Sequence, residues 1–128
     1  MAIFAFFSKG AECGVKDLYL NFAVGAAGAV GTINRRQGFT VTTPVVRVSA
    51  GLYTMNLDQR WQALVDRNVT VTGVTTAADG TYADVTTLSL NVAVPLIQIT
   101  MKNVAGTAAD PPNGSSLNIH LQLKDSTV

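Results

Sequence analysis

Hydrophobic and polar residues alternate along most of this chain, which is the pattern of a β-strand with one buried face. The clearest alternation covers residues 117–124, where four aliphatic residues take every second position and polar residues lie between them. Such regularity predicts a strand in the centre of a sheet, with one side against the core. Less regular alternation predicts further strands at residues 18–24, 39–43, 45–49, 51–57, 68–76, 84–94 and 96–102.

About eight strands separated by turn signals at intervals of roughly 8–12 residues are typical of an antiparallel β-sandwich or jelly roll. The pattern lacks the helices that would connect parallel strands, so a parallel α/β fold is not expected. The chain has 128 residues, which is the usual size of one domain, and it contains no internal repeat. We therefore expect residues 1–128 to form a single all-β domain.

The alternation stops after residues 51–57, which read GLYTMNL. Asp58 follows at a position suited to the N-cap of a helix, and Trp61 then shares one helical face with the aliphatic residues three and four positions later. This predicts a short helix near residues 58–66 that closes one end of the β domain. The main core-facing residues of the whole segment are expected to be Tyr53, Leu57 and Trp61.

Three segments have the composition of turns or loops. Residues 25–31, GAAGAVG, lack the Lys and the Ser or Thr of a phosphate-binding P-loop, so we interpret them as a turn or a bulged strand. Residues 32–38 are predicted to form a hairpin connection with Arg35 and Arg36 at its tip. Residues 103–116 are the longest irregular stretch, of a length that is often functional, and they include Asp110, Pro111 and Pro112.

The first residues of the chain carry four large hydrophobic side chains, those of Ile3, Phe4, Phe6 and Phe7. Chain termini are usually poorly ordered unless something holds them, so these side chains need a surface to bind. Two interpretations remain open: residues 1–8 are a first strand packed into the core, or they are an arm that docks on a neighbouring subunit. A secretory signal is not expected, because the segment has no basic start and Lys9 interrupts it.

Charged residues are scarce and balanced in sign. They make up 13% of the chain, with a formal net charge of +1, whereas an average globular protein has about 25%. Either a partner covers much of the surface, or uncharged polar residues cover it, and both interpretations remain open. Nucleic-acid binding normally needs a basic stripe, and no uncharged apolar run approaches the length of a membrane span, so neither nucleic acid nor a membrane is an expected partner.

No set of residues specifies a catalytic or metal site. His120 is the only histidine and Cys13 the only cysteine, which is too few for a zinc site and gives little support to a Cys–His nucleophile. One cysteine also excludes an intrachain disulfide. The carboxylates are scattered, and Asp110 near Asn113 is interpreted as part of a proline-stabilised turn rather than as an ion site. The sequence therefore predicts no enzymatic activity, cofactor or metal.

Two segments resemble small virion structural proteins of tailed bacteriophages. They are residues 46–57, VRVSAGLYTMNL, followed by Asp58 and a Trp–Leu segment, and residues 110–128, DPPNGSSLNIHLQLKDSTV. Within that group, size and composition are most similar to capsid decoration, or cement, proteins. The resemblance implies a β-sandwich or jelly roll, made in the host cytoplasm, that forms a homo-oligomer on the capsid exterior and ties neighbouring major capsid proteins together. A dimer or trimer would suit such a symmetric unit.

On this interpretation the partner contacts are expected at the N-terminal arm, the hairpin tip and the long loop. The residues concerned are Ile3, Phe4, Phe6, Phe7, Arg35, Arg36, Asp110, Pro111 and Pro112. Two other functions remain open: a tail, fibre or baseplate component of a virion, and a carbohydrate-binding β-sandwich module. The second needs an aromatic platform for sugars, which an interior Trp61 would not provide.

Overall fold

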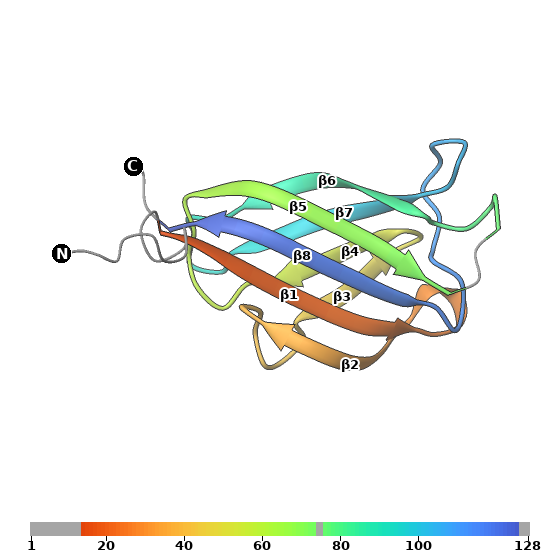
Figure 1. Cartoon of the computed structure of the whole chain (residues 1–128), viewed down its shortest axis with the longest axis horizontal. Coiled ribbons are helices and arrows are strands. Elements are labelled where there is room, and N and C mark those ends of the chain that lie inside the picture. Colours follow the sequence, from red (N-terminus) through yellow and green to blue (C-terminus); the bar gives the residue numbers. More distant parts are fainter. Residues whose placement is uncertain (1–13, 74–75, 126–128) are drawn as a thin grey trace, which may run out of the picture.

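The chain folds into two antiparallel β-sheets that face each other as a sandwich (Figure 1). The computed structural model describes residues 14–73 and 76–125. Within these ranges the chain forms eight strands and a single 3-10 turn at Ala26–Gly28, which confirms the predicted all-β sandwich. The strands are β1 (Val15–Val24), β2 (Val30–Gln37), β3 (Val45–Ser49), β4 (Leu52–Asn56), β5 (Ala63–Thr72), β6 (Tyr82–Ser89), β7 (Leu96–Lys102) and β8 (Ser116–Lys124).

Each sheet has four strands, and the closing strand of the chain is central in one of them. One sheet has the order β2-β1-β8-β5, and the other has the order β3-β4-β7-β6. The pairs β1–β2, β3–β4 and β6–β7 are neighbours in sequence and in space, whereas every other connection crosses from one sheet to the other. Because β8 pairs with both β1 and β5, the predicted central position of residues 117–124 is confirmed.

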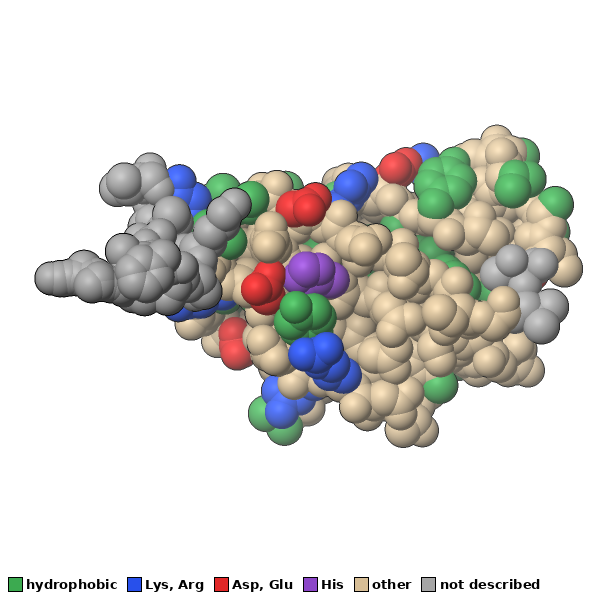
Figure 2. Space-filling model, viewed as in Figure 1, with side chains coloured by type: hydrophobic (Ala, Val, Ile, Leu, Met, Phe, Trp, Pro, Cys, Tyr) green, Lys and Arg blue, Asp and Glu red, His purple; other side chains and the backbone are tan. Residues whose placement is uncertain are grey.

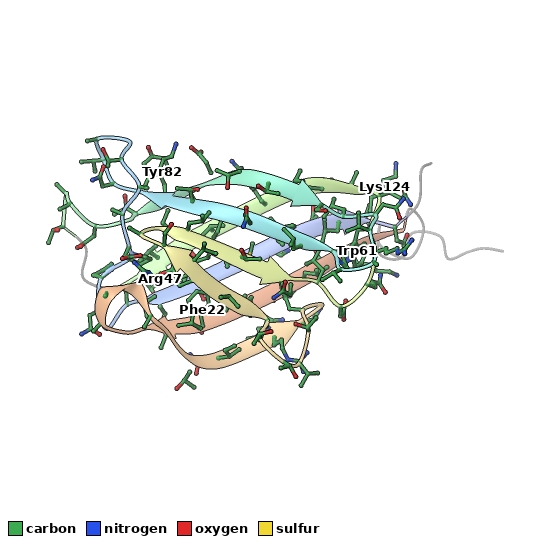
Figure 3. The ribbon with its side chains drawn as sticks, turned by 180° about the vertical axis from the view of Figure 1, so that it is seen from behind. Phe22, Arg47, Trp61, Tyr82 and Lys124 are labelled. Atoms are coloured by element: carbon green, nitrogen blue, oxygen red, sulfur yellow. The ribbon has the colours of Figure 1, made fainter. Side chains whose placement is uncertain are left out.

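Alternate residues of the central strands point between the sheets and form one core. Burial alternates residue by residue along β4, β7 and β8, as the sequence pattern predicts. Tyr53, Leu57 and Trp61 are buried as expected. Figure 3 shows Trp61 at the same end of the sandwich as Lys124, the last residue of β8, so this indole closes one end of the core. The largest fully buried side chains are Tyr53, Phe22, Phe39, Leu18, Leu20, Met55, Ile97, Ile99, Met101, Leu117, Leu121 and Leu123.

The predicted helix near residues 58–66 is wrong. This segment leaves β4, crosses to the other sheet through bends at residues 58–59 and 62, and enters β5 without forming a helix. The backbone N–H of Trp61 donates to the Leu90 carbonyl at 3.1 Å, and the next amide donates to the Lys124 carbonyl at 2.7 Å. These amides are therefore bound by distant segments instead of by a helical turn. Asp58 is exposed, and its predicted role as a helix cap is also wrong.

The predicted hairpin tip at Arg35 and Arg36 is wrong as well. The chain reverses between β1 and β2 at residues 25–29 instead, where Ala27 and Gly28 have φ values of 54° and 74°. This left-handed region suits glycine and makes a tight reversal possible. Both arginines lie inside β2, an edge strand whose residues are mostly exposed. The polar composition that suggested a turn therefore reflects an exposed edge strand.

The other strand boundaries agree with the sequence pattern to different degrees. Residues 39–43 contribute only an isolated bridge rather than a strand. β5 begins earlier than the predicted strand at residues 68–76, and β6 ends at Ser89, before the bends that precede β7. The strand predicted at residues 96–102 is confirmed as β7.

Tyr53 connects the β3-β4-β7-β6 sheet to the turn between β1 and β2. Its hydroxyl donates to the Gly28 carbonyl at 2.6 Å. Burial, with a smaller contribution from the Asp110 carboxylate, raises the pKa of Tyr53 to about 12. The hydroxyl therefore remains a donor across the physiological pH range.

Replacing Tyr53 with phenylalanine is expected to lower the free energy of unfolding by about 1–2 kcal/mol, because the buried Gly28 carbonyl would lose its partner. Urea unfolding measures the change. Tyr82→Phe removes the same hydroxyl from an exposed ring and is expected to change stability by less than about 0.5 kcal/mol. Equal effects of the two exchanges would show that the bond to Gly28 adds nothing to stability.

Candidate functional site

The outer side of the β2-β1-β8-β5 sheet carries a cluster of polar and aromatic side chains. Strand alternation turns every second residue of β1 and β8 away from the core, and the register between these strands sets Tyr19 opposite His120. Figure 2 looks onto this side and shows the histidine, in purple, beside an acidic and a hydrophobic side chain. We call this surface the polar face; it comprises Tyr19, Asn21, Arg35, Asn68, Thr70, Asn118 and His120, together with the backbone of Leu20 and Ile119.

A row of stacked side chains crosses the polar face from β2 to β8. The rings of Tyr19 and His120 are parallel within 4°, with their centroids 4.5 Å apart. The Arg35 guanidinium carbon lies 3.9 Å from the centroid of the Tyr19 ring, which is a cation–π distance. Tyr19 is therefore held between a cation from one neighbouring strand and an imidazole from the other. We call these three side chains the stacked row.

A carboxylate at the end of the polar face holds the histidine in place. The Asp17 Oδ1 atom lies 3.0 Å from His120 Nε2 and accepts a hydrogen bond from Gln122 Nε2 at 3.1 Å. The hydrogen bonds from His120 and from Gln122 hold the pKa of Asp17 below its ordinary value. Asp17 is thus a carboxylate that orients a ring, and each of these groups already has a partner.

A second row, made of amides, runs parallel to the stacked row. The side chains of Asn21 and Asn118 hydrogen-bond to each other, and Asn34 Nδ2 donates to Asn21 Oδ1 at 3.0 Å. The register sets Thr70 opposite Asn118 and Asn68 opposite His120. The polar face contains a shallow, open depression of about 150 Å³.

The sequence pattern correctly turns Tyr19 and His120 away from the core but does not bring them together. Their strands pair across a separation of 101 residues, because residue 120 minus residue 19 gives 101. No local motif marks such a pair. The stacking follows from strand order and register, which depend on contacts throughout the sandwich.

A second polar cluster joins the long loop between β7 and β8 to the edge strand β3. Arg47 Nε and Nη2 donate to the two carboxylate oxygens of Asp110 at 2.9 and 2.7 Å, and the Gly51 amide donates to Asp110 Oδ1 at 2.8 Å. Figure 3 shows Arg47 at the end of the sandwich away from Trp61. We call this arrangement the loop latch.

The geometry of the loop latch requires glycine at position 51 and keeps the Asp110 carboxylate ionised. Gly51 has a φ value of 73°, and a Cβ atom there would lie 2.5 Å from the Met101 carbonyl oxygen. Burial opposes ionisation of Asp110, but the hydrogen bonds from Arg47 and the Gly51 amide outweigh it and keep the pKa of Asp110 below its ordinary value. The Asp110 carboxylate is therefore ionised and has a structural role, because both of its oxygens accept hydrogen bonds from Arg47 or the Gly51 amide.

The predicted contact residues lie in different places. Arg35 belongs to the polar face, while Arg36 Nη1 donates to the Phe39 carbonyl at 2.8 Å. In the long loop, Asp110 forms the loop latch, Pro111 is buried and Pro112 is half-buried. The N-terminal residues Ile3, Phe4, Phe6 and Phe7 lie outside the described residues, as does Cys13.

Metal-binding chemistry has no counterpart in residues 14–73 and 76–125. In these ranges no three side chains of His, Cys, Asp or Glu come together in a group that could hold an ion. The carboxylates that do have close partners, such as Asp17, Asp84 and Asp110, form pairs with single basic groups or amides.

Apolar side chains are exposed at two opposite edges of the sandwich. Val46 and Val48 lie on the edge strand β3 and are 41% and 55% exposed. At the opposite edge of the sandwich, the last strands of the two sheets, β5 and β6, lie next to each other. Val65 of β5 and Leu88 of β6 are 51% and 49% exposed there and line a shallow groove of about 300 Å³. We call these two regions the β3 edge and the β5–β6 groove.

Comparison with protein-family models, with curated proteins and with solved structures found no match to this chain. Among the described residues, no helix has the length and apolar character that crossing a membrane would require.

Proposed function

We propose that this protein is a structural component of a tailed-bacteriophage virion, which decorates the capsid exterior and bridges neighbouring major capsid proteins. The observation that carries the proposal is the exposure of apolar side chains at opposite edges of the sandwich. Val46 and Val48 lie at one edge, and Val65 and Leu88 at the other. A bridging protein needs two separate contact regions on a rigid body, and this sandwich has them.

Exposed aliphatic side chains on sheet edges favour contact with another protein. Edge strands present unpaired backbone groups and are usually protected by charged residues or bulges. β3 instead turns two valines to solvent, and the β5–β6 groove exposes a valine and a leucine. Burying each of these half-exposed side chains would contribute about 1 kcal/mol. Many copies on one shell would combine such weak contacts through multivalency.

The resemblance of residues 46–57 and 110–128 to phage virion proteins gives the proposal its setting. The first of these segments contains the β3 edge and the whole of β4, and the second contains part of the loop latch and the whole of β8. The residues that carry the resemblance therefore belong to the framework of the fold as well as to one of the proposed contact surfaces. A tail, fibre or baseplate position would use the same contacts, and electron microscopy of labelled particles distinguishes these locations.

Substitutions at the two edges test the bridging proposal. The double exchange Val46→Asp and Val48→Asp, and separately Leu88→Asp, are each expected to weaken binding to capsid shells by about tenfold or more, because a carboxylate would be desolvated in the contact. Co-sedimentation with purified undecorated shells measures binding. Either edge alone is expected to matter, since a bridge needs both contacts.

Val41→Asp is the matched control for these variants. Val41 is 78% exposed but belongs to neither edge, so the same exchange there is expected to leave shell binding unchanged. Far-ultraviolet circular dichroism and thermal unfolding show whether each variant keeps its fold. Folded edge variants that bind shells as well as the Val41 variant does would contradict the proposal.

The native mass of the protein tests its expected association. A homo-oligomer, dimer or trimer, is expected from the proposed role, and the two edges are also the natural surfaces for contact between copies. Analytical ultracentrifugation of the parent protein and of the two edge variants identifies the edge involved. If one of the edges forms the contact between copies, the aspartate variant of that edge is expected to have a lower native mass than the parent protein.

A further inference from the structure

We infer that the polar face is a binding site for an uncharged oligosaccharide. The inference is independent of the capsid proposal, because it rests on a different sheet surface from the two apolar edges. What carries it is the pairing of the stacked row, Arg35–Tyr19–His120, with the parallel row of amides around Asn21 and Asn118. Between them lies the shallow depression on the outer side of the sheet.

The two rows differ in height, and this difference makes the depression. Tyr19 and His120 carry rings, whereas their neighbours two residues along each strand, Asn21 and Asn118, carry short amides. The depression is lined by both rows and by the backbone of Leu20 and Ile119. A ligand placed there would lie over the amides with one side against the ring edges. The depression is open, so an extended chain of sugar units would cross it without being enclosed.

The groups that line the depression suit hydroxyl groups. An amide side chain has two N–H donors and an acceptor oxygen, and a threonine hydroxyl both donates and accepts. Asn68 and Thr70 of β5 lie beside His120 and Asn118. Among the described residues, the side-chain Nδ2 atoms of Asn118 and Asn68 donate to no protein acceptor. These N–H groups remain available to a ligand that carries hydrogen-bond acceptors. A pyranose is such a ligand, because each of its hydroxyl groups both accepts and donates.

The charged groups around the depression carry both signs, which favours an uncharged ligand over an anion. The Arg35 cation lies over the Tyr19 ring, and the Asp17 carboxylate is taken by His120 and Gln122. A carboxylate, sulfate or phosphate ligand would meet one cation, Arg35, but it would also approach the Asp17 carboxylate beside His120. Most of the side chains that line the depression are uncharged, so they would bind a ligand mainly through hydrogen bonds.

The site is also preorganised. Tyr19 is held on both ring faces, His120 is held by stacking and by Asp17, and Asn21 is held by two other amides. Side chains that are already fixed lose little conformational entropy when a ligand binds. Such an arrangement suits weak, selective binding of sugars on a flat sheet.

Nuclear magnetic resonance titration of the full-length, ¹⁵N-labelled chain tests the inference. The probes are uncharged hexasaccharides of glucose (α- and β-linked), mannose, galactose and xylose, each added to a concentration of about 10 mM, which detects dissociation constants to the millimolar range. At least one probe is expected to give saturable shifts of the side-chain amides of Asn21, Asn68 and Asn118. Residues on the outer side of β7 are expected to show none.

Two substitutions and a matched control localise the binding. Asn68→Ala and Thr70→Val remove hydrogen-bonding groups from β5 without touching the stacked row, and each is expected to weaken binding of the responding sugar by about fivefold or more. Gln98→Ala is the control, because Gln98 donates to Thr54 on the outer side of the other sheet. It is expected to leave sugar binding unchanged.

Three results would overturn the inference. The first is the absence of saturable shifts with every uncharged probe. The second is tighter binding of an acidic oligosaccharide, such as oligogalacturonate, than of any uncharged probe, since the site would then select charge. The third is loss of shell binding in Asn68→Ala or Thr70→Val without any sugar response, which would assign the polar face to a protein partner. Because the edge variants are tested on shells, the capsid proposal stands or fails separately.

Discussion

Replacing Trp61 with alanine is expected to lower the free energy of unfolding by about 3–5 kcal/mol, the usual cost of truncating a large buried aromatic side chain. The indole is 3% exposed and closes one end of the core. Its backbone N–H is bound by the Leu90 carbonyl in the β6–β7 connection. The truncation would leave a cavity where the chain passes from β4 to β5. Guanidinium unfolding followed by circular dichroism measures the loss.

Two companion variants distinguish packing from the other interpretations of this segment. The Trp61 Nε1 atom is buried and has no hydrogen-bond partner within the described residues, so Trp61→Phe removes an unsatisfied donor and is expected to cost less than about 2 kcal/mol. Asp58→Ala is expected to change stability by less than about 0.5 kcal/mol, because there is no helix to cap. A loss of about 1 kcal/mol from Asp58→Ala would show that the Asp58 side chain stabilises this crossover by another contact.

Replacing Asp110 with alanine is expected to lower the free energy of unfolding by about 2–3 kcal/mol. The carboxylate accepts three hydrogen bonds, two from Arg47 and one from the Gly51 amide, and bonds to an ionised group are stronger than those between neutral groups. The loss is not expected to be larger, because 20% of the Asp110 side chain and 29% of the Arg47 side chain remain exposed, and solvent weakens such pairs. Urea unfolding at neutral pH measures the change.

Lowering the pH is expected to release the same loop latch. The pKa of Asp110 lies below its ordinary value in the folded protein, so the unfolded chain binds the proton more tightly than the folded chain. The contribution of Asp110 is therefore complete above its unfolded pKa of about 3.9 and is lost as the pH falls through its lower folded pKa. Asp110→Asn keeps the shape but does not titrate. Its stability is expected to fall less steeply below pH ~4 than that of the parent protein, and equal slopes would contradict a role for this carboxylate.

The sequence by itself determined the class of fold and most of its core. Alternation in residues 117–124 and 96–102 depends only on which side of a strand faces the core, and both were predicted correctly as strands. Tyr53, Leu57 and Trp61 lie in the core as predicted, because large apolar side chains on the inward face of an alternating segment are usually buried. These features require no knowledge of which strands pair.

Only the tertiary structure decided how the strands pair and what the polar residues do. Trp61 is buried in the crossover between β4 and β5 and not in a helix, because its backbone N–H donates to the Leu90 carbonyl, which lies far along the chain. Arg47 meets Asp110, and Tyr19 meets His120, through strand order and register. Local propensity cannot encode contacts between residues that are 63 or 101 positions apart. The alternating pattern thus determined which side chains face outward, and long-range packing decided which of them meet to form the polar face.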